Sequence, residues 1–129
     1  MIAGIGIDII EVDRVETRVS SGNGFREYVF SPREIEYCES MSNKYQHYAA
    51  RFSAKEAFLK AMGTGWIGDA AFHEIEVCQE PSSPPYIKLY GGTLAMFNER
   101  NLGNIFLSLS HIKQTATAIV IIEKIELSS

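Results

Sequence analysis

Two acidic residues, Asp8 and Glu56, stand where the sequence predicts unusual surroundings for a carboxylate. Glu56 belongs to the segment from Tyr45 to Gly65, in which apolar residues recur with the period of an α-helix. At the helical spacing, Glu56 projects only about 40° around the axis from Phe52, inside the stripe that should face the core. A carboxylate buried alone costs several kcal/mol unless it is paired or binds a metal ion. The pattern therefore predicts a cation beside Glu56.

The apolar stripe of this helix consists of Tyr45, Tyr48, Ala49, Phe52, Leu59 and Met62. Gly63 is expected to end the helix. Lys55 lies at the margin of the stripe, and Lys60 lies one turn beyond Glu56. From the helix alone, an ordinary ion pair between Glu56 and Lys60 at the rim of the core, contributing a few tenths of a kcal/mol, explains the pattern equally well.

Asp8 lies near the end of an alternating segment, residues 2–10, which predicts a β-strand. One face of this strand carries Ile5, Ile7 and Ile9, and the other carries Gly4, Gly6 and Asp8. Two glycines on one face are typical of a close approach by another backbone or a ligand. We therefore expect another group to come near Asp8. The alternative is that Asp8 caps the helix that follows.

That following segment predicts a short helix with a basic outer side. Its apolar stripe consists of Val12, Val15 and Val19. Arg14 and Arg18 are one turn apart and point away from the stripe toward solvent. They form a local basic patch on a chain whose net charge is -4.

The later segments predict the remaining elements. A capping box at Ser31–Glu34 begins a helix over about residues 32–40. Residues 72–79, where His73, Ile75 and Val77 alternate with Glu74 and Glu76, and residues 86–90 predict a hairpin. A helix follows from residue 91 to about 103, and two more strands span 105–110 and 115–125.

These elements favour an α+β fold. Strands and helices are segregated along the chain, and neighbouring strands are joined as hairpins. We therefore expect a single domain over residues 1–129, with a mainly antiparallel sheet packed with a long central helix. The run AIVIIEKI near the end is apolar on both faces, which predicts a central strand or a strand covered by another subunit.

The glycines of Gly63–Gly68 match the pattern G-x-G-x-x-G of dinucleotide-binding proteins. In those proteins the pattern follows a strand and begins a helix. Here it follows a helix and leads to a strand, so we interpret it as a loop that ends the helix. Its backbone amides could still hold a phosphate group.

Composition excludes several other classes. An acidic chain is not typical of proteins that bind nucleic acids, and no apolar run approaches the ~18 residues of a membrane span. The N-terminus lacks the features of a signal peptide, so we expect a cytoplasmic protein. Cys38 and Cys78 have neither metal-site nor redox spacing. Ser110 and His111 are adjacent and would face opposite sides of a strand, which argues against a serine hydrolase.

Three parts of the sequence together resemble the 4'-phosphopantetheinyl transferases. They are GIGID at Gly4–Asp8, RFSAKEAFLKA at Arg51–Ala61 with GTG at Gly63–Gly65 after it, and Ser110-His111 followed by Ala116–Ala118. The short chain with one set of motifs is most similar to the holo-[acyl-carrier-protein] synthase branch. The similarity spans nearly the whole chain.

The resemblance implies that Asp8 and Glu56 bind Mg²⁺, which would supply the cation beside Glu56. In the family, a serine of the apo acyl carrier protein attacks the β-phosphate of coenzyme A. Phosphopantetheine is transferred for fatty acid biosynthesis, and adenosine 3',5'-bisphosphate leaves. The resemblance makes Glu56 the base, directly or through a metal-bound water, and gives Lys60 the neutralisation of pyrophosphate charge.

The same resemblance implies further contacts and partners. The nucleotide end of coenzyme A would be held by Arg51, Gly63, Thr64, Gly65, Ser110 and His111. The carrier protein would dock on Arg14 and Arg18, and short members of the family form homotrimers whose sites lie between subunits. The alternative hypotheses are a coenzyme A- or nucleotide-binding subunit without catalysis, and a structural domain in which Glu56 and Lys60 are merely paired.

Overall fold

The computed structural model describes residues 1–63 and 72–126. The elements follow the order β1 (Ile2–Glu11), α1 (Val12–Ser20), α2 (Phe25–Val29), α3 (Pro32–Glu39), α4 (Lys44–Met62), a 3-10 turn (Phe72–Glu74), β2 (Ile75–Cys78), β3 (Tyr86–Leu89), α5 (Gly91–Glu99), β4 (Leu102–His111) and β5 (Thr115–Lys124). Among these described elements, no helix combines the length and apolar character needed to cross a membrane.

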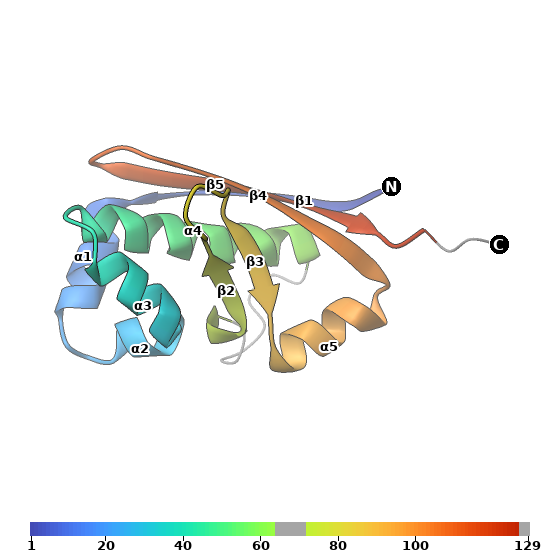
Figure 1. The fold of residues 1–129 in the computed structure, drawn as a ribbon, viewed down its shortest axis with the longest axis horizontal. Coiled ribbons are helices and arrows are strands. Elements are labelled where there is room, and N and C mark those ends of the chain that lie inside the picture. The colour runs from blue at the N-terminus through green and yellow to red at the C-terminus, as the bar shows by residue number, and fades with distance from the viewer. Residues whose placement is uncertain (64–71, 127–129) are drawn as a thin grey trace.

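The strands form two antiparallel sheets, as expected. One has the strand order β1-β5-β4, and the other is the hairpin of β2 and β3. β5 is the middle strand of the larger sheet, as its sequence predicts. Figure 1 shows this sheet along one side of the molecule with α4 packed directly beneath it. The hairpin, α3 and α5 lie on the other side of α4, so α4 is the central helix of an α+β fold.

The contact between α4 and β1 depends on small residues. A Cβ atom on Gly4 would lie 1.9 Å from the carbonyl oxygen of Ala61, and one on Gly6 would lie 1.9 Å from that of Ala57. Four residues of a helix rise about 6 Å and two residues of a strand advance about 6.6 Å. The spacing of Ala57 and Ala61 on α4 therefore nearly matches the spacing of Gly6 and Gly4 on β1. The predicted close approach at the glycines is therefore confirmed, and the approaching backbone is that of α4.

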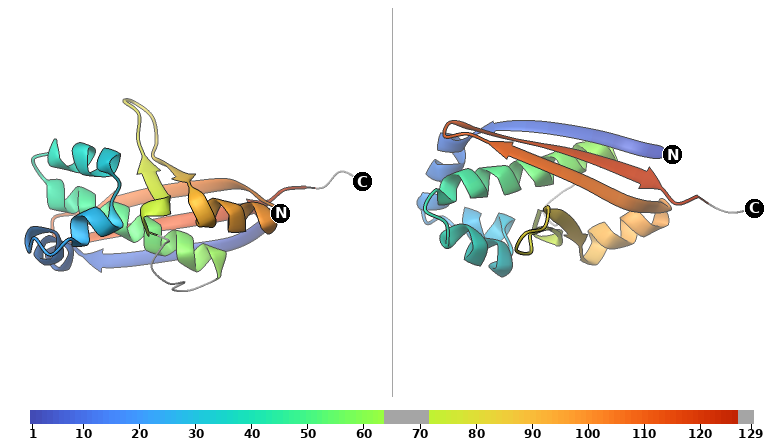
Figure 2. Two further views of the ribbon diagram at one scale, coloured as in Figure 1. Left: turned by 90° about the horizontal axis from the view of Figure 1, so that it is seen from below. Right: turned by 45° about the horizontal axis from the view of Figure 1, so that its top comes forward.

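The outer face of the larger sheet is not covered by any described element. The views in Figure 2 agree that the helices all lie on the opposite side of this sheet. Ile5, Ile7 and Ile9 of β1 are 58%, 63% and 71% exposed, and Phe106 and Ile119 on the neighbouring strands are also exposed. The isoleucine face of β1 thus faces away from the core of this chain.

The segment before β2 differs from the expected strand over residues 72–79. Phe72–Glu74 form a 3-10 turn because the Glu74 carboxylate turns away to accept hydrogen bonds from the Gly92 and Thr93 amides at the start of α5. The alternation of acidic residues there does not mark a solvent-facing side. Glu76 is buried, and its carboxylate accepts hydrogen bonds from the hydroxyls of Ser31 and Tyr90.

Candidate active site

Asp8 lies on the face of β1 that meets α4, two residues beyond the glycine contact. One carboxylate oxygen, Oδ1, is 3.2 Å from the Lys60 ammonium nitrogen, and the other, Oδ2, is 3.0 Å from Ser53 Oγ. The Asp8 side chain is only 13% exposed. It does not cap α1, because the N-cap position of that helix is Glu11 and shows no side-chain cap. Asp8 is therefore a nearly buried carboxylate held by two residues of α4.

Glu56 is half-buried on the adjoining surface of α4. Burial raises the pKa of this carboxyl, and the negative charge of Asp8 raises it further. The positive charges of Lys60 and Arg18 act in the opposite direction. Within the described residues, no hydrogen bond or ion pair reaches Glu56. The rim ion pair between Glu56 and Lys60 is thus not formed, because Lys60 turns to Asp8 instead.

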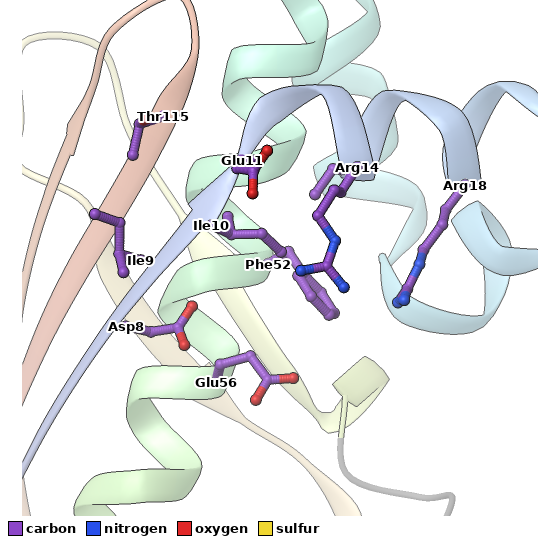
Figure 3. Close-up of a pocket in the computed structure, with 10 residues that line it drawn as sticks. Asp8, Ile9, Ile10, Glu11, Arg14, Arg18, Phe52, Glu56 and Thr115 are labelled. Carbon is purple, nitrogen blue, oxygen red and sulfur yellow. The ribbon is translucent and has the colours of Figure 1, made fainter.

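Asp8 and Glu56 line one cleft of about 440 Å³. Its walls also include Arg14 and Arg18 of α1, Phe52 of α4 and Thr115 of β5. Figure 3 shows the two carboxylates on neighbouring elements and both arginine side chains extending from α1 beside them. The arginines are exposed, as the sequence predicts, but they belong to the mouth of this cleft and not to a separate surface.

The carboxylates of this cleft fit a hard divalent cation whose remaining ligands come from the substrate and from water. Among the described residues, no cluster of three or more histidine, cysteine or acidic side chains could hold a metal by itself. Mg²⁺ commonly binds through one or two carboxylates and takes its other ligands from water and substrate phosphates. Burial, and after it the negative charge of Asp8, raises the pKa of Glu56, and positive charge between the two carboxylates would relieve both effects.

Lys55 is a fully buried charge on α4, as is Arg51, whereas Glu56 is only half-buried. The Lys55 ammonium nitrogen is 2.8 Å from Glu34 Oε1, and both side chains are completely inaccessible to solvent. It also donates to the carbonyl oxygens of Phe72 and Ile75. Lys55 was placed at a margin of the stripe, yet α4 is covered on several sides, so residues at that margin are interior as well.

Arg51 and His111, two of the residues expected at the nucleotide end, lie away from this cleft. Arg51 is about 140° around the helix from Glu56 and lines a separate cleft of about 330 Å³ with Arg33 and Tyr37. Its guanidinium stacks over the Tyr37 ring at 4.0 Å. Arg51 is 1% exposed, and its Nε has no hydrogen-bond partner among the described residues.

His111, at the end of β4, contacts the side chains of Gln46 and His47 near the start of α4. Its Nδ1 is 2.8 Å from Gln46 Oε1, and its ring packs edge-on against His47 at 5.0 Å. Ser110 is exposed on the opposite face of β4. One chain therefore brings together Asp8, Glu56 and Lys60, but it does not bring Arg51, Ser110 or His111 to them.

Gly63 ends α4 in the left-handed conformation, with φ of 71°, as its sequence position predicts. Thr64 and Gly65 lie outside the described residues. Sequence reasoning missed Ser53, Thr117 and Glu34, which contact Asp8 or Lys55 from distant positions. Ser53 is the only polar residue between Arg51 and Lys55 in the motif, which is the one local signal for it.

Comparison with known proteins gives a consistent result. The model of the 4'-phosphopantetheinyl transferase superfamily matches residues 4–119. The holo-[acyl-carrier-protein] synthase of Cytophaga hutchinsonii is 43% identical over 127 residues, covering 96% of this chain and 99% of that protein. The protein of the same name from Geobacter sulfurreducens is 42% identical over 125 residues, covering 96% and 99%.

Solved structures of similar proteins share the whole fold. The holo-[acyl-carrier-protein] synthase of Neisseria meningitidis superimposes with a TM-score of 0.86 at 30% identity, over 96% of this chain and 100% of that one. The Helicobacter pylori synthase in complex with coenzyme A gives a TM-score of 0.79 at 32% identity, over 92% and 99%. A Bacillus anthracis synthase, also in complex with coenzyme A, gives 0.78 at 33% identity, over 96% and 98%.

Proposed function

The chain belongs to the 4'-phosphopantetheinyl transferase superfamily, and from this premise we propose that it is a holo-[acyl-carrier-protein] synthase. It transfers the 4'-phosphopantetheine group of coenzyme A to a serine hydroxyl of an apo acyl carrier protein. The observation that carries this proposal is the pairing of Asp8 and Glu56 in one cleft, on a chain that matches synthases over nearly its full length. A cytoplasmic location and a part in fatty acid biosynthesis stay predictions from the sequence.

In the transfer, the serine oxygen forms a bond to the β-phosphorus of coenzyme A while the bond from that phosphorus to the bridging oxygen breaks. The serine proton goes to a base, and adenosine 3',5'-bisphosphate leaves. Such reactions depend on in-line positioning and on positive charge at the phosphate oxygens. The protein therefore needs a base, cations and two binding surfaces, and it needs no covalent intermediate.

Asp8 and Glu56 are the residues that would hold a divalent cation, and we propose Mg²⁺ because both offer hard oxygen ligands. When bound, Mg²⁺ supplies positive charge at the pyrophosphate oxygens. Lys60 lies beside Asp8 with its side chain 54% exposed, so its ammonium group can turn to the same phosphates. Glu56 is the proposed base, because burial raises the pKa of its carboxyl above the usual range, which makes the carboxylate a stronger proton acceptor.

The nucleotide end of coenzyme A is proposed to bind Arg51 and His111. Arg51 supports this because a buried guanidinium with an unsatisfied Nε is suited to an anion that comes from outside the chain. His111 stands nearby on β4 with its ring partly buried. We also propose that Ser110 and the loop residues Gly63, Thr64 and Gly65 contribute, as the family resemblance implies.

A homotrimer would bring the two groups of site residues together. Within one chain, Asp8 and Glu56 line one cleft and Arg51 lines another. We propose that a complete site combines Asp8 and Glu56 of one subunit with Arg51 and His111 of its neighbour. The uncovered face of the larger sheet is suited to such an assembly, because its exposed isoleucines are costly to leave in water. We propose that this face is the subunit interface.

The function is tested by incubating the protein with coenzyme A, Mg²⁺ and a purified apo acyl carrier protein. The carrier should gain the mass of one phosphopantetheine group, and equimolar adenosine 3',5'-bisphosphate should appear. A carrier in which the acceptor serine is replaced by alanine is the control. Binding of coenzyme A without any gain in carrier mass would favour the non-catalytic alternative.

A further inference from the structure

The hydroxyl of Ser53 lies at the point where α4 meets Asp8. Ser53, Ala57 and Ala61 are four residues apart and form one ridge of α4 that runs along the inner face of β1. The glycines of β1 lie against the backbone carbonyls of the two alanines. The third position of the ridge meets Asp8, and there the helix carries a hydroxymethyl group in place of a methyl group.

A serine in the middle of a helix usually bonds the carbonyl four residues back or points to solvent. Ser53 does neither, because its hydroxyl is completely buried and reaches across to β1. Its Oγ is 3.0 Å from Asp8 Oδ2 and 3.1 Å from the Asp8 carbonyl oxygen. The hydroxyl has one proton, so it can donate to only one of these two acceptors at a time.

Thr117 of β5 reduces this competition. Its Oγ1 is 2.7 Å from the Asp8 carbonyl oxygen, which is a better distance than Ser53 offers to the same atom. The Ser53 proton is then best used on Oδ2, because a hydrogen bond to a charged carboxylate is about twice as strong as one to a neutral carbonyl. The two hydroxyls thus each take a different acceptor of Asp8: Ser53 bonds Oδ2, and Thr117 bonds the carbonyl oxygen.

The two carboxylate oxygens of Asp8 consequently have very different partners. Oδ2 is held by a buried hydroxyl that cannot leave, and Oδ1 is held by the Lys60 ammonium group, which is 54% exposed and can move away. Oδ1 is therefore the oxygen that can exchange its partner for a cation. The side-chain torsions of Asp8 are fixed before that cation arrives, which removes part of the ordering cost of binding.

We propose that Ser53 is a positioning residue for the divalent cation, and that Thr117 directs its proton to the carboxylate by occupying the Asp8 carbonyl. This inference rests on the metal role of Asp8 that is part of the proposed function. It assigns to both hydroxyls a role beyond the stability of the α4–β1 contact.

The test is direct binding of Mn²⁺, as the probe for Mg²⁺, to the protein loaded with coenzyme A in the absence of carrier protein. Free Mn²⁺ is followed by electron paramagnetic resonance, with coenzyme A alone as the blank. Four variants are compared: Ser53→Ala, Thr117→Val, the double variant, and Thr93→Val. Thr93 is a matched control, because it is buried and its hydroxyl bonds a different carboxylate, that of Glu74.

Ser53→Ala should weaken Mn²⁺ binding roughly tenfold, as loss of a group that orients a metal ligand typically does. Thr117→Val should weaken it less, and should have almost no further effect once Ser53 is already alanine. Thr93→Val should leave Mn²⁺ affinity unchanged, even where thermal unfolding shows that it costs stability. This non-additivity is not expected if the hydroxyls only support the fold.

Unchanged Mn²⁺ affinity in Ser53→Ala would overturn the inference. An effect of Thr117→Val on Mn²⁺ affinity that is as large in Ser53→Ala as in the wild type would also overturn it. A wild-type protein that transfers phosphopantetheine without binding Mn²⁺ would also overturn it. If instead the variants alter Mn²⁺ binding as expected but the wild type modifies no carrier, the positioning role stands and the proposed function fails.

Discussion

The ammonium nitrogen of Lys60 lies 3.2 Å from Asp8 Oδ1, on the neighbouring strand, and not against Glu56, one turn away on the same helix. This leaves Glu56 as a half-buried carboxylate beside a second acid, and no cation among residues 1–63 and 72–126 forms an ion pair with it. A pair of carboxylates arranged in this way is unfavourable for the free protein. The arrangement is the one expected of a site that binds a cation from solution.

Glu56→Gln is predicted to stabilise the metal-free protein at neutral pH. The pKa of Glu56 is raised above its usual value of 4.5, mainly by burial. The native state therefore holds its proton more tightly than the unfolded state, and the wild type loses stability as pH rises from 4.5 through the raised pKa. Glutamine does not ionise, so the variant should escape this loss.

The expected gain is about 1–3 °C in Tm at pH 7 in the presence of a chelator, with the modest size reflecting partial exposure. It should disappear below pH 4.5, where Glu56 is protonated in both states. Differential scanning calorimetry of both proteins across this pH range is the measurement. A lower Tm for Glu56→Gln at pH 7 would show that the charged carboxylate is stabilising and contradict this account.

Lys55→Met is predicted to cost about 3–5 kcal/mol of unfolding free energy, because it leaves the Glu34 carboxylate charged and unpaired in the interior. Lys60→Met is the matched control, since Lys60 is largely exposed and its removal should cost less than about 1 kcal/mol. Urea unfolding of the two variants makes the comparison. Equal losses would mean that the Lys55–Glu34 pair contributes no more than a surface contact.

Subunits with different lesions are predicted to restore activity when they are assembled together. Glu56→Gln removes one half of the proposed site, and Arg51→Met removes the other while keeping a buried side chain of similar length. Each variant alone should be inactive. Co-expressed with different tags and purified as mixed trimers, they should recover on the order of a third of the wild-type activity, because each mixed trimer holds one intact site out of three.

Mixtures prepared from subunits that carry the same lesion are the control for this experiment. If mixed assemblies stay inactive, the two groups of residues do not meet across an interface. A fully active monomer at micromolar concentration, measured by light scattering, would be equally incompatible with a shared site.

The double variant with alanine at Arg14 and Arg18 is predicted to bind the carrier protein less well. Exposed ion pairs contribute about 0.2–1 kcal/mol each and are screened over about 8 Å in physiological salt. The KM for the carrier should therefore rise several-fold at low salt, and its salt dependence should flatten. Replacing the exposed Lys88 and Lys113 with alanine removes the same charge elsewhere and is the control.

The position of these arginines at the mouth of the Asp8 and Glu56 cleft sharpens the test. The KM for coenzyme A should stay nearly unchanged if they meet only the carrier. If the double variant instead raises the KM for coenzyme A and leaves that for the carrier alone, the arginines bind the phosphates and the docking surface lies elsewhere.

Much of the fold could be predicted because its signals are local. The alternation before Asp8, the capping box at Ser31 and Glu34, and the glycine at the end of α4 each act within a few residues, and the structure confirms them. The glycines of β1 also predicted a contact with a segment distant in the sequence. Only a neighbouring backbone or ligand explains why one strand face should lack side chains, and α4 is that neighbour.

What could not be predicted depends on which distant segments meet. Helical periodicity marked Glu56 as the buried charge, but α4 is enclosed by two layers, so Lys55 is the more deeply buried residue and Glu34 is its partner. The same holds for Glu76, which reads as solvent-facing and is satisfied by Ser31 and Tyr90. Helical spacing separates Arg51 from Glu56 by about 140°, but only the structure shows that the two residues line different clefts.

The most direct test of the account is transfer by Glu56→Gln in saturating Mg²⁺, measured as the mass of the acyl carrier protein over time. Asp8→Asn is expected to behave alike, and Glu16→Gln, on the exposed side of α1, is the control for loss of an acidic charge. The account predicts that the wild type and Glu16→Gln convert the carrier fully, while Glu56→Gln and Asp8→Asn, though folded, leave its mass unchanged. Near-normal turnover by Glu56→Gln would contradict the central claim that the Asp8 and Glu56 cleft carries out the transfer.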